Sequence, residues 1–308
     1  MSEEVLLGGQ AVLEGVMMRA PGAYAVSVRK KGGRVVTVRR EVARWSDRRP
    51  YLKAPVLRGV VVLFQSMALG MSALNFSAEQ AMEEDEPAAE AGASSGGWAL
   101  GFSLLFAVLF AVGLFFYVPL LATEGVARLV PALRQPIAFN LVEGGIRIGL
   151  LVGYILAISS MEDMRRVFQY HGAEHKVVSA YEAGDPLTVE GARRHSTLHP
   201  RCGTSFLLFV MLISILAFSL IPGSAPFAAK LLARVLLLPL IAGASFEVLR
   251  VSARNRRRLL FALLVTPGLW LQRLTTREPS DDQLQVAIEA LRAALGGEID
   301  AGVELAPL

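Results

Sequence analysis

The chain has 308 residues, of which 53% are hydrophobic and 19% charged, and its mean hydropathy is +0.47. A soluble domain carries about 25% charged residues, so this composition excludes disorder, a coiled coil and a collagen-like fibre and favours a membrane protein. The net charge of +4 is modest, and no stripe of basic residues with interleaved aromatics occurs, so nucleic acid is not an expected partner. A single cysteine, Cys202, excludes a disulfide framework.

Residues 1–55 predict a small β-rich region that faces water. Within residues 23–40, valines alternate with polar residues on either side of Gly32 and Gly33, which is typical of a β-hairpin. The first 20 residues lack the basic cluster and apolar stretch of a secretory signal peptide. We therefore expect the N-terminus in the cytoplasm.

The next two segments predict weaker elements. Residues 56–76 are apolar but contain Gln65, Ser66 and two glycines, which favours a helix that lies at the membrane interface or re-enters the membrane. Residues 77–97 are rich in alanine, glycine, serine and acidic residues and predict a flexible linker.

Four stronger apolar segments predict transmembrane helices, two in residues 98–161 and two in residues 203–249. They cover residues 98–121, 136–161, 203–222 and 227–249. Lysine and arginine mark the cytoplasmic side, and they number 12 in residues 1–58, 6 in 162–202 and 8 in 250–308, against 2 in 122–135 and none in 223–226. Four spans place all three basic segments in the cytoplasm, whereas a fifth at 56–76 would put the first of them outside.

Residues 250–308 predict a cytoplasmic region with a basic segment, an interfacial stretch at 259–271 and an amphipathic helix. Ser280 and Gln283 form a capping box that begins this last helix. The expected fold is a mainly α membrane protein with about four transmembrane helices, a small cytoplasmic N-terminal β-rich region and cytoplasmic helical elements.

The chemistry-bearing residues concentrate in the loop 162–202. All four histidines of the chain lie there, as two pairs spaced i, i+4, and Cys202 follows the second pair. Residues four apart share a helix face, so two imidazoles can converge on one ion. His171, Glu174 and His175 form the pattern H-x-x-E-H, in which the histidines hold zinc and the glutamate acts as general base.

A zinc site needs further ligands, and the sequence offers several. Glu247 lies 72 residues after His175 at the predicted end of the fourth span, and His199 and Cys202 are nearer in the chain. The remaining competitors are His195, Glu182 and Glu190, with Glu162 and Asp163 as carboxylates that could orient a histidine.

Other interpretations remain open. His171, His175, His199 and Cys202 would close a tetrahedral structural site without catalysis. The histidines would otherwise form only hydrogen bonds in a polar loop, and Cys202 would be a small buried residue or a nucleophile paired with a histidine. Glu143 and Arg147 form a helical i, i+4 pair that suggests a buried ion pair, and a transporter hypothesis rests on them alone.

Long segments of the chain resemble the YqhQ-like family of bacterial membrane proteins, whose members are often labelled predicted metal-dependent enzymes. The resemblance rests on GGQAVLEGVMMR (8–19), FQYHGAEHKVVSAYEAG (168–184), LHPRCGTSFL (198–207) and PGLWLQRLTTREPSDDQLQVAI (267–288). It implies a protein of the bacterial plasma (inner) membrane. His171, Glu174, His175, His199 and Cys202 match the family pattern, whereas His195 is its least typical position.

The sequence therefore predicts a zinc-dependent hydrolase of the inner membrane with a site that faces the cytoplasm, and a peptidase is one form that this hydrolase could take. The alternative is a non-enzymatic membrane scaffold or assembly factor with a structural metal. The expected partners are the lipid bilayer, a membrane-protein or peptide substrate, and a second copy of the chain in a homo-oligomer.

Overall fold

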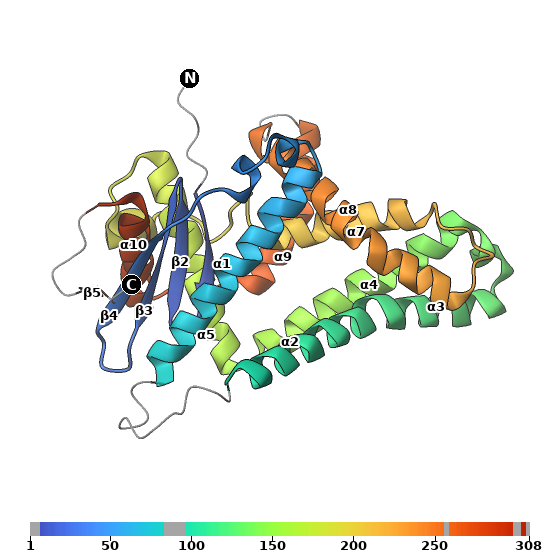
Figure 1. Cartoon of the computed structure of the whole chain (residues 1–308), viewed down its shortest axis with the longest axis horizontal. Coiled ribbons are helices and arrows are strands. Elements are labelled where there is room, and N and C mark those ends of the chain that lie inside the picture. The colour runs from blue at the N-terminus through green and yellow to red at the C-terminus, as the bar shows by residue number, and fades with distance from the viewer. Residues whose placement is uncertain (1–6, 83–95, 256–258, 298–302, 306–308) are drawn as a thin grey trace.

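The computed structural model describes residues 7–82, 96–255, 259–297 and 303–305. Figure 1 shows a mixed sheet-and-helix unit at one end of the molecule and a bundle of long helices that extends from it. Most of the expected linker 77–97, and part of the basic segment after residue 250, lie outside the described residues.

The expected N-terminal β region is a sheet in the order β1-β2-β3-β4-β5. The strands are β1 (Gly8–Val12), β2 (Gly15–Ala20), β3 (Ala23–Arg29), β4 (Val35–Glu41) and β5 (Val303–Leu305). The first four pair antiparallel, and β5 pairs parallel with β4. Gly33 adopts a positive φ of 83° in the β3–β4 turn, which confirms the hairpin predicted in residues 23–40.

Both faces of this sheet are covered, because its side chains alternate between two apolar clusters. On one face, Val16 and Met18 pack with helices α5 (Glu162–Ala183) and α10 (Asp281–Leu295). On the other face, Met17 and Val26 pack with Ala73 of α1 (Leu57–Met82). Ser280 caps α10 through the predicted capping box with Gln283.

The bundle consists of long apolar helices (Figure 1). They are α2 (Gly96–Val112) and α3 (Val118–Leu129), joined by the π-helical segment Gly113–Tyr117, then α4 (Pro136–Ser159), α7 (Gly203–Phe218), α8 (Phe227–Arg254) and α9 (Leu259–Thr275). Short helical turns cover Trp45–Asp47, Pro50–Lys53, Pro131–Arg134 and α6 (Val189–Arg193).

Among the described residues, four helices are long and apolar enough to cross a membrane, which indicates a multi-pass membrane protein. They are Leu57–Ala81, Gly101–Leu129, Pro136–Ser159 and Phe227–Ser252. Three coincide with expected spans. The other expected span, 203–222, is the 16-residue helix α7, about 24 Å long against a hydrocarbon core of roughly 30 Å.

Helix α1 differs from the expectation for residues 56–76 in length, since it has 26 residues. Its contacts with the segment before it and with α8 fix its position. Gln65 accepts a hydrogen bond from the backbone N–H of Trp45 at 3.3 Å and donates to the carbonyl of Ala43 at 2.8 Å. Toward its start, Gly59 meets Gly243 of α8 so closely that a Cβ on Gly59 would lie 2.7 Å from the Gly243 carbonyl oxygen. Helix α1 thus joins the sheet to the bundle (Figure 1).

Candidate metal centre

Helix α5 carries three of the predicted site residues on one stretch, His171, Glu174 and His175. The glycine within this motif has a packing role. A Cβ on Gly172 would collide with the backbone carbonyl of Arg277, whose N–H in turn donates to the Phe168 carbonyl at 2.9 Å. Gly172 therefore lets the segment before α10 lie directly against α5, which holds the histidine-bearing turn in place.

Both histidines of the motif are oriented by backbone carbonyl groups. Nδ1 of His171 lies 2.8 Å from the Thr275 carbonyl oxygen, and Nδ1 of His175 lies 2.5 Å from that of Thr197. A carbonyl only accepts hydrogen bonds, so each Nδ1 carries the proton and each Nε2 keeps its lone pair. Metal-binding histidines are typically held in this manner.

Cys202 lies directly beside these imidazoles. It is the N-cap of α7, where its sulfur accepts a hydrogen bond from the Thr204 backbone N–H at 3.4 Å. Nε2 of His171 is 3.2 Å from the Cys202 Sγ. Single ligand atoms of His171, His175 and Cys202 all lie within 4.8 Å of one another, and we call these three residues the His–Cys cluster. Bond lengths of 2.0–2.3 Å place tetrahedral zinc ligands about 3.5 Å apart, so small rotations would fit this set to one ion.

The cluster leaves one buried nitrogen unsatisfied. His175 is 1% exposed, and its Nε2 has no hydrogen-bond partner among the described residues. A buried polar atom without a partner costs about 1–3 kcal/mol, and such atoms are rare in folded proteins. A ligand that accepts this lone pair would remove that cost.

Glu174 borders the same cluster. Its Oε2 is 3.5 Å from Nε2 of His175, and its side chain is 8% exposed. The sheet confines it, because a Cβ on Gly9 of β1 would lie 2.6 Å from the Glu174 Cγ. The carboxylate is therefore held close to the place where the three ligand atoms converge.

His199 belongs to the periphery of the cluster. Its ring centroid is 5.7 Å from that of His175, and its Nε2 is 3.5 Å from Oε2 of Glu182. Gln272 of α9 holds the His199 backbone on both sides, since its side chain accepts from the N–H and donates to the carbonyl, each at 2.8 Å.

The structure does not bring Glu247 to this cluster. Arg58 of α1 donates two hydrogen bonds to its carboxylate, at 3.1 and 2.6 Å, because the end of α8 packs against α1 instead of α5. His195 is also elsewhere, 2.7 Å from Asp185. Glu162 and Asp163, proposed as orienting carboxylates, lie exposed in the first turn of α5, and backbone carbonyls perform that task.

The residue before the motif anchors α5 to the sheet. The Tyr170 hydroxyl is buried and donates a 3.4 Å hydrogen bond to Glu14, which is also bound by Arg166. Burial raises the pKa of Tyr170, and the negative charge of Glu14 raises it further, so the hydroxyl remains neutral.

A cavity of 390 Å³ opens over the cluster. Its walls come from β1, α5 and the start of α7, and they include Gly8, Gly9, Glu174, His199 and Arg201. Its size is within the range of small-ligand sites.

Comparison with known proteins places the chain in a family. The model of a family described as "Protein of unknown function (DUF1385)" matches residues 54–297. The chain belongs to this family. It is 37% identical over 298 residues to the "Uncharacterized protein YqhQ" of Bacillus subtilis (strain 168), with 94% of this chain and 92% of that protein covered. No solved structure matches it significantly. The predicted YqhQ-like membership is confirmed, and neither description states an activity.

The family match includes every residue of the His–Cys cluster and of the helical bundle, whereas strands β1–β4 precede it. Four contributors to the site were missed in the sequence. Thr197 and Thr275 act through backbone carbonyls, which no side-chain pattern reveals, and Gly9 acts through lack of a side chain. Gln272 lies in the segment PGLWLQ (267–272). A glutamine within this apolar stretch was the one sequence feature that could have indicated its role.

Proposed function

We propose that the chain is a metal-dependent hydrolase of the bacterial plasma membrane, with zinc held by His171, His175 and Cys202. The observation that carries this proposal is the buried lone pair of His175 Nε2, which has no partner in the described structure and faces two other ligand atoms. Two imidazole nitrogens and one thiolate suit zinc better than magnesium or calcium, which prefer oxygen ligands. The ring of His199 lies next to these ligands, with its centroid 5.7 Å from that of His175.

Three protein ligands, rather than four, are typical of a catalytic zinc site with an open position. Bound zinc would lower the pKa of a coordinated water toward neutrality and polarise a carbonyl group. Oε2 of Glu174 is placed to take the proton of the attacking water and to pass it to the leaving group. The Thr275 and Thr197 carbonyls favour the Nδ1-protonated tautomers, so the Nε2 atoms of His171 and His175 would be the ligand atoms of a bound zinc ion.

The wall of the cavity supports a peptide substrate. Strand β1 is the first in the sheet order, so among the described strands its outer edge has no neighbour. Gly8 and Gly9 line the cavity there, are exposed, and have no side chains to cover their amides. An extended peptide can add to such an edge by backbone hydrogen bonds, which would place it alongside Glu174.

The packing also supports the orientation that we propose. The sheet, α5 and α10 form one packed unit, so they lie on one side of the membrane. Helix α1 packs on the sheet, so the chain leaves this unit after residue 82 and returns by 162, then leaves at 203 and returns by 276, and each excursion needs an even number of crossings. The pairs α2–α3 with α4, and α7 with α8, satisfy this if α1 and α9 lie at the interface.

The basic residues of 1–58, 162–202 and 250–308 favour the cytoplasm for this unit. A cysteine introduced by Lys30→Cys should react with an impermeant maleimide in inside-out vesicles and not in intact cells, with the wild type, whose Cys202 is buried, as the background control. Labelling of intact cells would overturn the orientation without affecting the metal assignment.

The first test of function is the metal content of protein purified in detergent without chelator. We expect about one zinc per chain in the wild type and in Glu174→Gln, and less than about a tenth of that in His175→Ala. His195→Ala is the matched control, since His195 binds Asp185 and should leave zinc unchanged. A wild-type protein without metal would overturn the proposal.

The second test is activity of the zinc-loaded protein on a library of extended peptides. Glu174→Gln should lower kcat about 100-fold or more while the zinc content stays the same. Full activity in that variant would reject Glu174 as the base. If the wild type cleaves no peptide and the variants that lose zinc fail to fold, the zinc is structural.

One distance favours a second candidate, a cysteine nucleophile. The Cys202 sulfur is 3.2 Å from His171 Nε2 and lies at the N-terminus of α7, so an imidazole base stands directly beside a thiol, as in cysteine-nucleophile sites. In that case metal-free protein would keep its activity, and alkylation of Cys202 by iodoacetamide would abolish it. Zinc dependence of the activity would exclude this alternative.

A further inference from the structure

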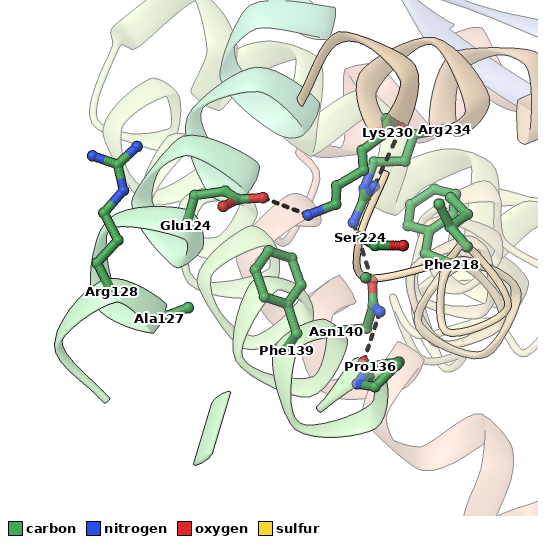
Figure 2. Close-up of a pocket in the computed structure, with 12 residues that line it drawn as sticks. Glu124, Ala127, Arg128, Pro136, Phe139, Asn140, Phe218, Ser224, Lys230 and Arg234 are labelled. Atoms are coloured by element: carbon green, nitrogen blue, oxygen red, sulfur yellow. Dashed lines mark hydrogen bonds and ion pairs between the residues drawn. The ribbon is translucent and has the colours of Figure 1, made fainter. Parts of the chain in front are cut away.

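A second cavity lies at the opposite end of the bundle from the His–Cys cluster, and it is larger, with a volume of 530 Å³. It is enclosed by α3, the start of α4, the loop between α7 and α8, and the start of α8. Figure 2 shows Lys230 and Arg234 of α8 directed toward Glu124, Asn140 and Ser224. Phe139, Phe218 and Ile221 supply its apolar walls.

Behind this cavity, three charged side chains share buried hydrogen bonds, and we call Glu143, Arg147 and Arg234 the distal arginine cluster. Arg234 donates to both carboxylate oxygens of Glu143, at 3.0 and 2.5 Å, and Arg147 donates to one of them at 2.5 Å. All three side chains are 4% exposed or less. One carboxylate is therefore shared by two guanidinium groups, which leaves one positive charge in excess.

The surrounding backbone accommodates this excess without adding negative charge. The π-helical segment Gly113–Tyr117 disrupts the regular helix, and its Phe115 carbonyl accepts a 2.8 Å hydrogen bond from Nε of Arg147. Asn140 accepts from Arg234 at 3.2 Å, and Ser214 accepts from Arg147 at 3.3 Å. These dipoles reduce the cost of burying the charge, but they do not neutralise it.

Lys230 brings a further positive charge to the cavity wall. Its side chain is 9% exposed and forms one ion pair, at 2.6 Å to Glu124. An ammonium has three N–H donors, and among the described residues Glu124 is the acceptor for one, so two can serve a ligand. Its Nζ also lies 5.2 Å from the centre of the Phe139 ring, which keeps it over the apolar wall.

The charge imbalance extends through this end of the bundle. Residues 101–159 and 203–241 contain five basic residues, which are Arg128, Arg134, Arg147, Lys230 and Arg234, and two acidic ones, Glu124 and Glu143. Ionised groups in membrane-spanning segments are costly and mark functional sites. In the proposed orientation these cations also lie on the outer side, where basic residues are disfavoured. Such an excess is most stable with an anion beside it.

We propose that the distal cavity is a binding site for a phosphate-bearing anion, with Lys230, Arg234 and the exposed Arg128 as its cationic partners. Arginine and lysine together are suited to phosphate, since guanidinium offers paired donors and ammonium a compact charge. The cavity is at the loop end of the bundle, which in the proposed topology is the depth of the phospholipid headgroups. Phe139, Phe218 and Ile221 would contact the glycerol and the first methylenes of a lipid. This site is independent of the zinc proposal.

The test compares two sources of phosphate on the delipidated full-length protein in neutral detergent. The probes are dihexanoyl phosphatidylglycerol and inorganic phosphate, with dihexanoylglycerol as the phosphate-free control. Binding is read from the shift of the thermal unfolding midpoint as each probe is titrated. The variants are Lys230→Gln and Arg128→Gln, and Arg40→Gln at the exposed end of β4 is the matched control.

We expect the wild type to bind phosphatidylglycerol, with dihexanoylglycerol giving no saturable shift. Lys230→Gln should weaken binding about tenfold and Arg128→Gln about threefold, whereas Arg40→Gln leaves it unchanged. Because Arg128 is exposed, its variant keeps the test decisive if Lys230→Gln does not fold. Saturable binding of inorganic phosphate with the same variant pattern would identify a free anion as the source. Absence of binding by both probes, or equal binding by all variants, would overturn the proposal.

Discussion

The two buried polar clusters of this protein have opposite imbalances. The His–Cys cluster gathers electron-pair donors, and one of them, His175 Nε2, is buried without a hydrogen-bond partner in the described structure. The distal arginine cluster gathers hydrogen-bond donors and positive charge around the single carboxylate of Glu143. A surplus of lone pairs favours a cation and a surplus of positive charge favours an anion. The same folded chain therefore offers two chemically distinct sites at the two ends of its bundle.

The largest expected effect would come from loss of the shared carboxylate. Glu143→Gln leaves Arg147 and Arg234 buried without a counter-charge, so we expect the free energy of unfolding to fall by about 3–5 kcal/mol. Unfolding in mixed detergent micelles measures it. Glu247→Gln is the control, because its partner Arg58 is 27% exposed and the expected loss is about 1 kcal/mol. Equal losses in both variants would remove the distinction between a buried cluster and a simple ion pair.

Zinc addition tests the opposite imbalance. At 100 times its dissociation constant, zinc should raise the free energy of unfolding of the metal-free protein by about 2.7 kcal/mol, because only the folded state gathers the three ligands. His171→Ala should remove this stabilisation. If the variant gains as much as the wild type, the ion binds somewhere other than the His–Cys cluster.

The contact between β1 and the cluster can be tested with two adjacent glycines. A Cβ on Gly9 would lie 2.6 Å from the Glu174 Cγ and 2.7 Å from the Met17 carbonyl oxygen, whereas a Cβ on Gly8 meets nothing within 4 Å. We expect Gly9→Ala to destabilise the protein by about 1–3 kcal/mol. Gly8→Ala should change it by less than about 0.5 kcal/mol. Calorimetry on both variants measures the difference, and a neutral Gly9→Ala would show that Glu174 is free to move.

The smallest expected effect concerns α10, which packs on α5 in the sheet-and-helix unit. Ser280→Ala removes the cap of α10, which packs on α5, and should cost about 1 kcal/mol. Zinc affinity should stay the same, since the cap does not contact the cluster. A loss of zinc affinity that also amounts to about 1 kcal/mol would show that the His–Cys cluster depends on the stability of α10. The cluster would then not be a preorganised site.

The sequence alone determined the elements with a strong local pattern. Apolar length predicted most of the membrane helices, valine alternation around Gly32 and Gly33 predicted the β3–β4 hairpin, and Ser280 with Gln283 predicted the start of α10. Helical spacing also grouped His171, Glu174 and His175, because residues three and four apart share a helix face. These features depend on neighbours in the chain, so one sequence suffices to read them.

Tertiary structure decided what depends on distant segments. It brought Cys202 to His171, assigned Glu247 to Arg58, and placed Gly9 against Glu174, contacts that span 31, 189 and 165 residues of chain. It also let α1, a helix as long as a membrane span, cover the second face of the sheet. Composition measures how apolar a helix is but not which surface it meets, and only the packed fold supplies that surface.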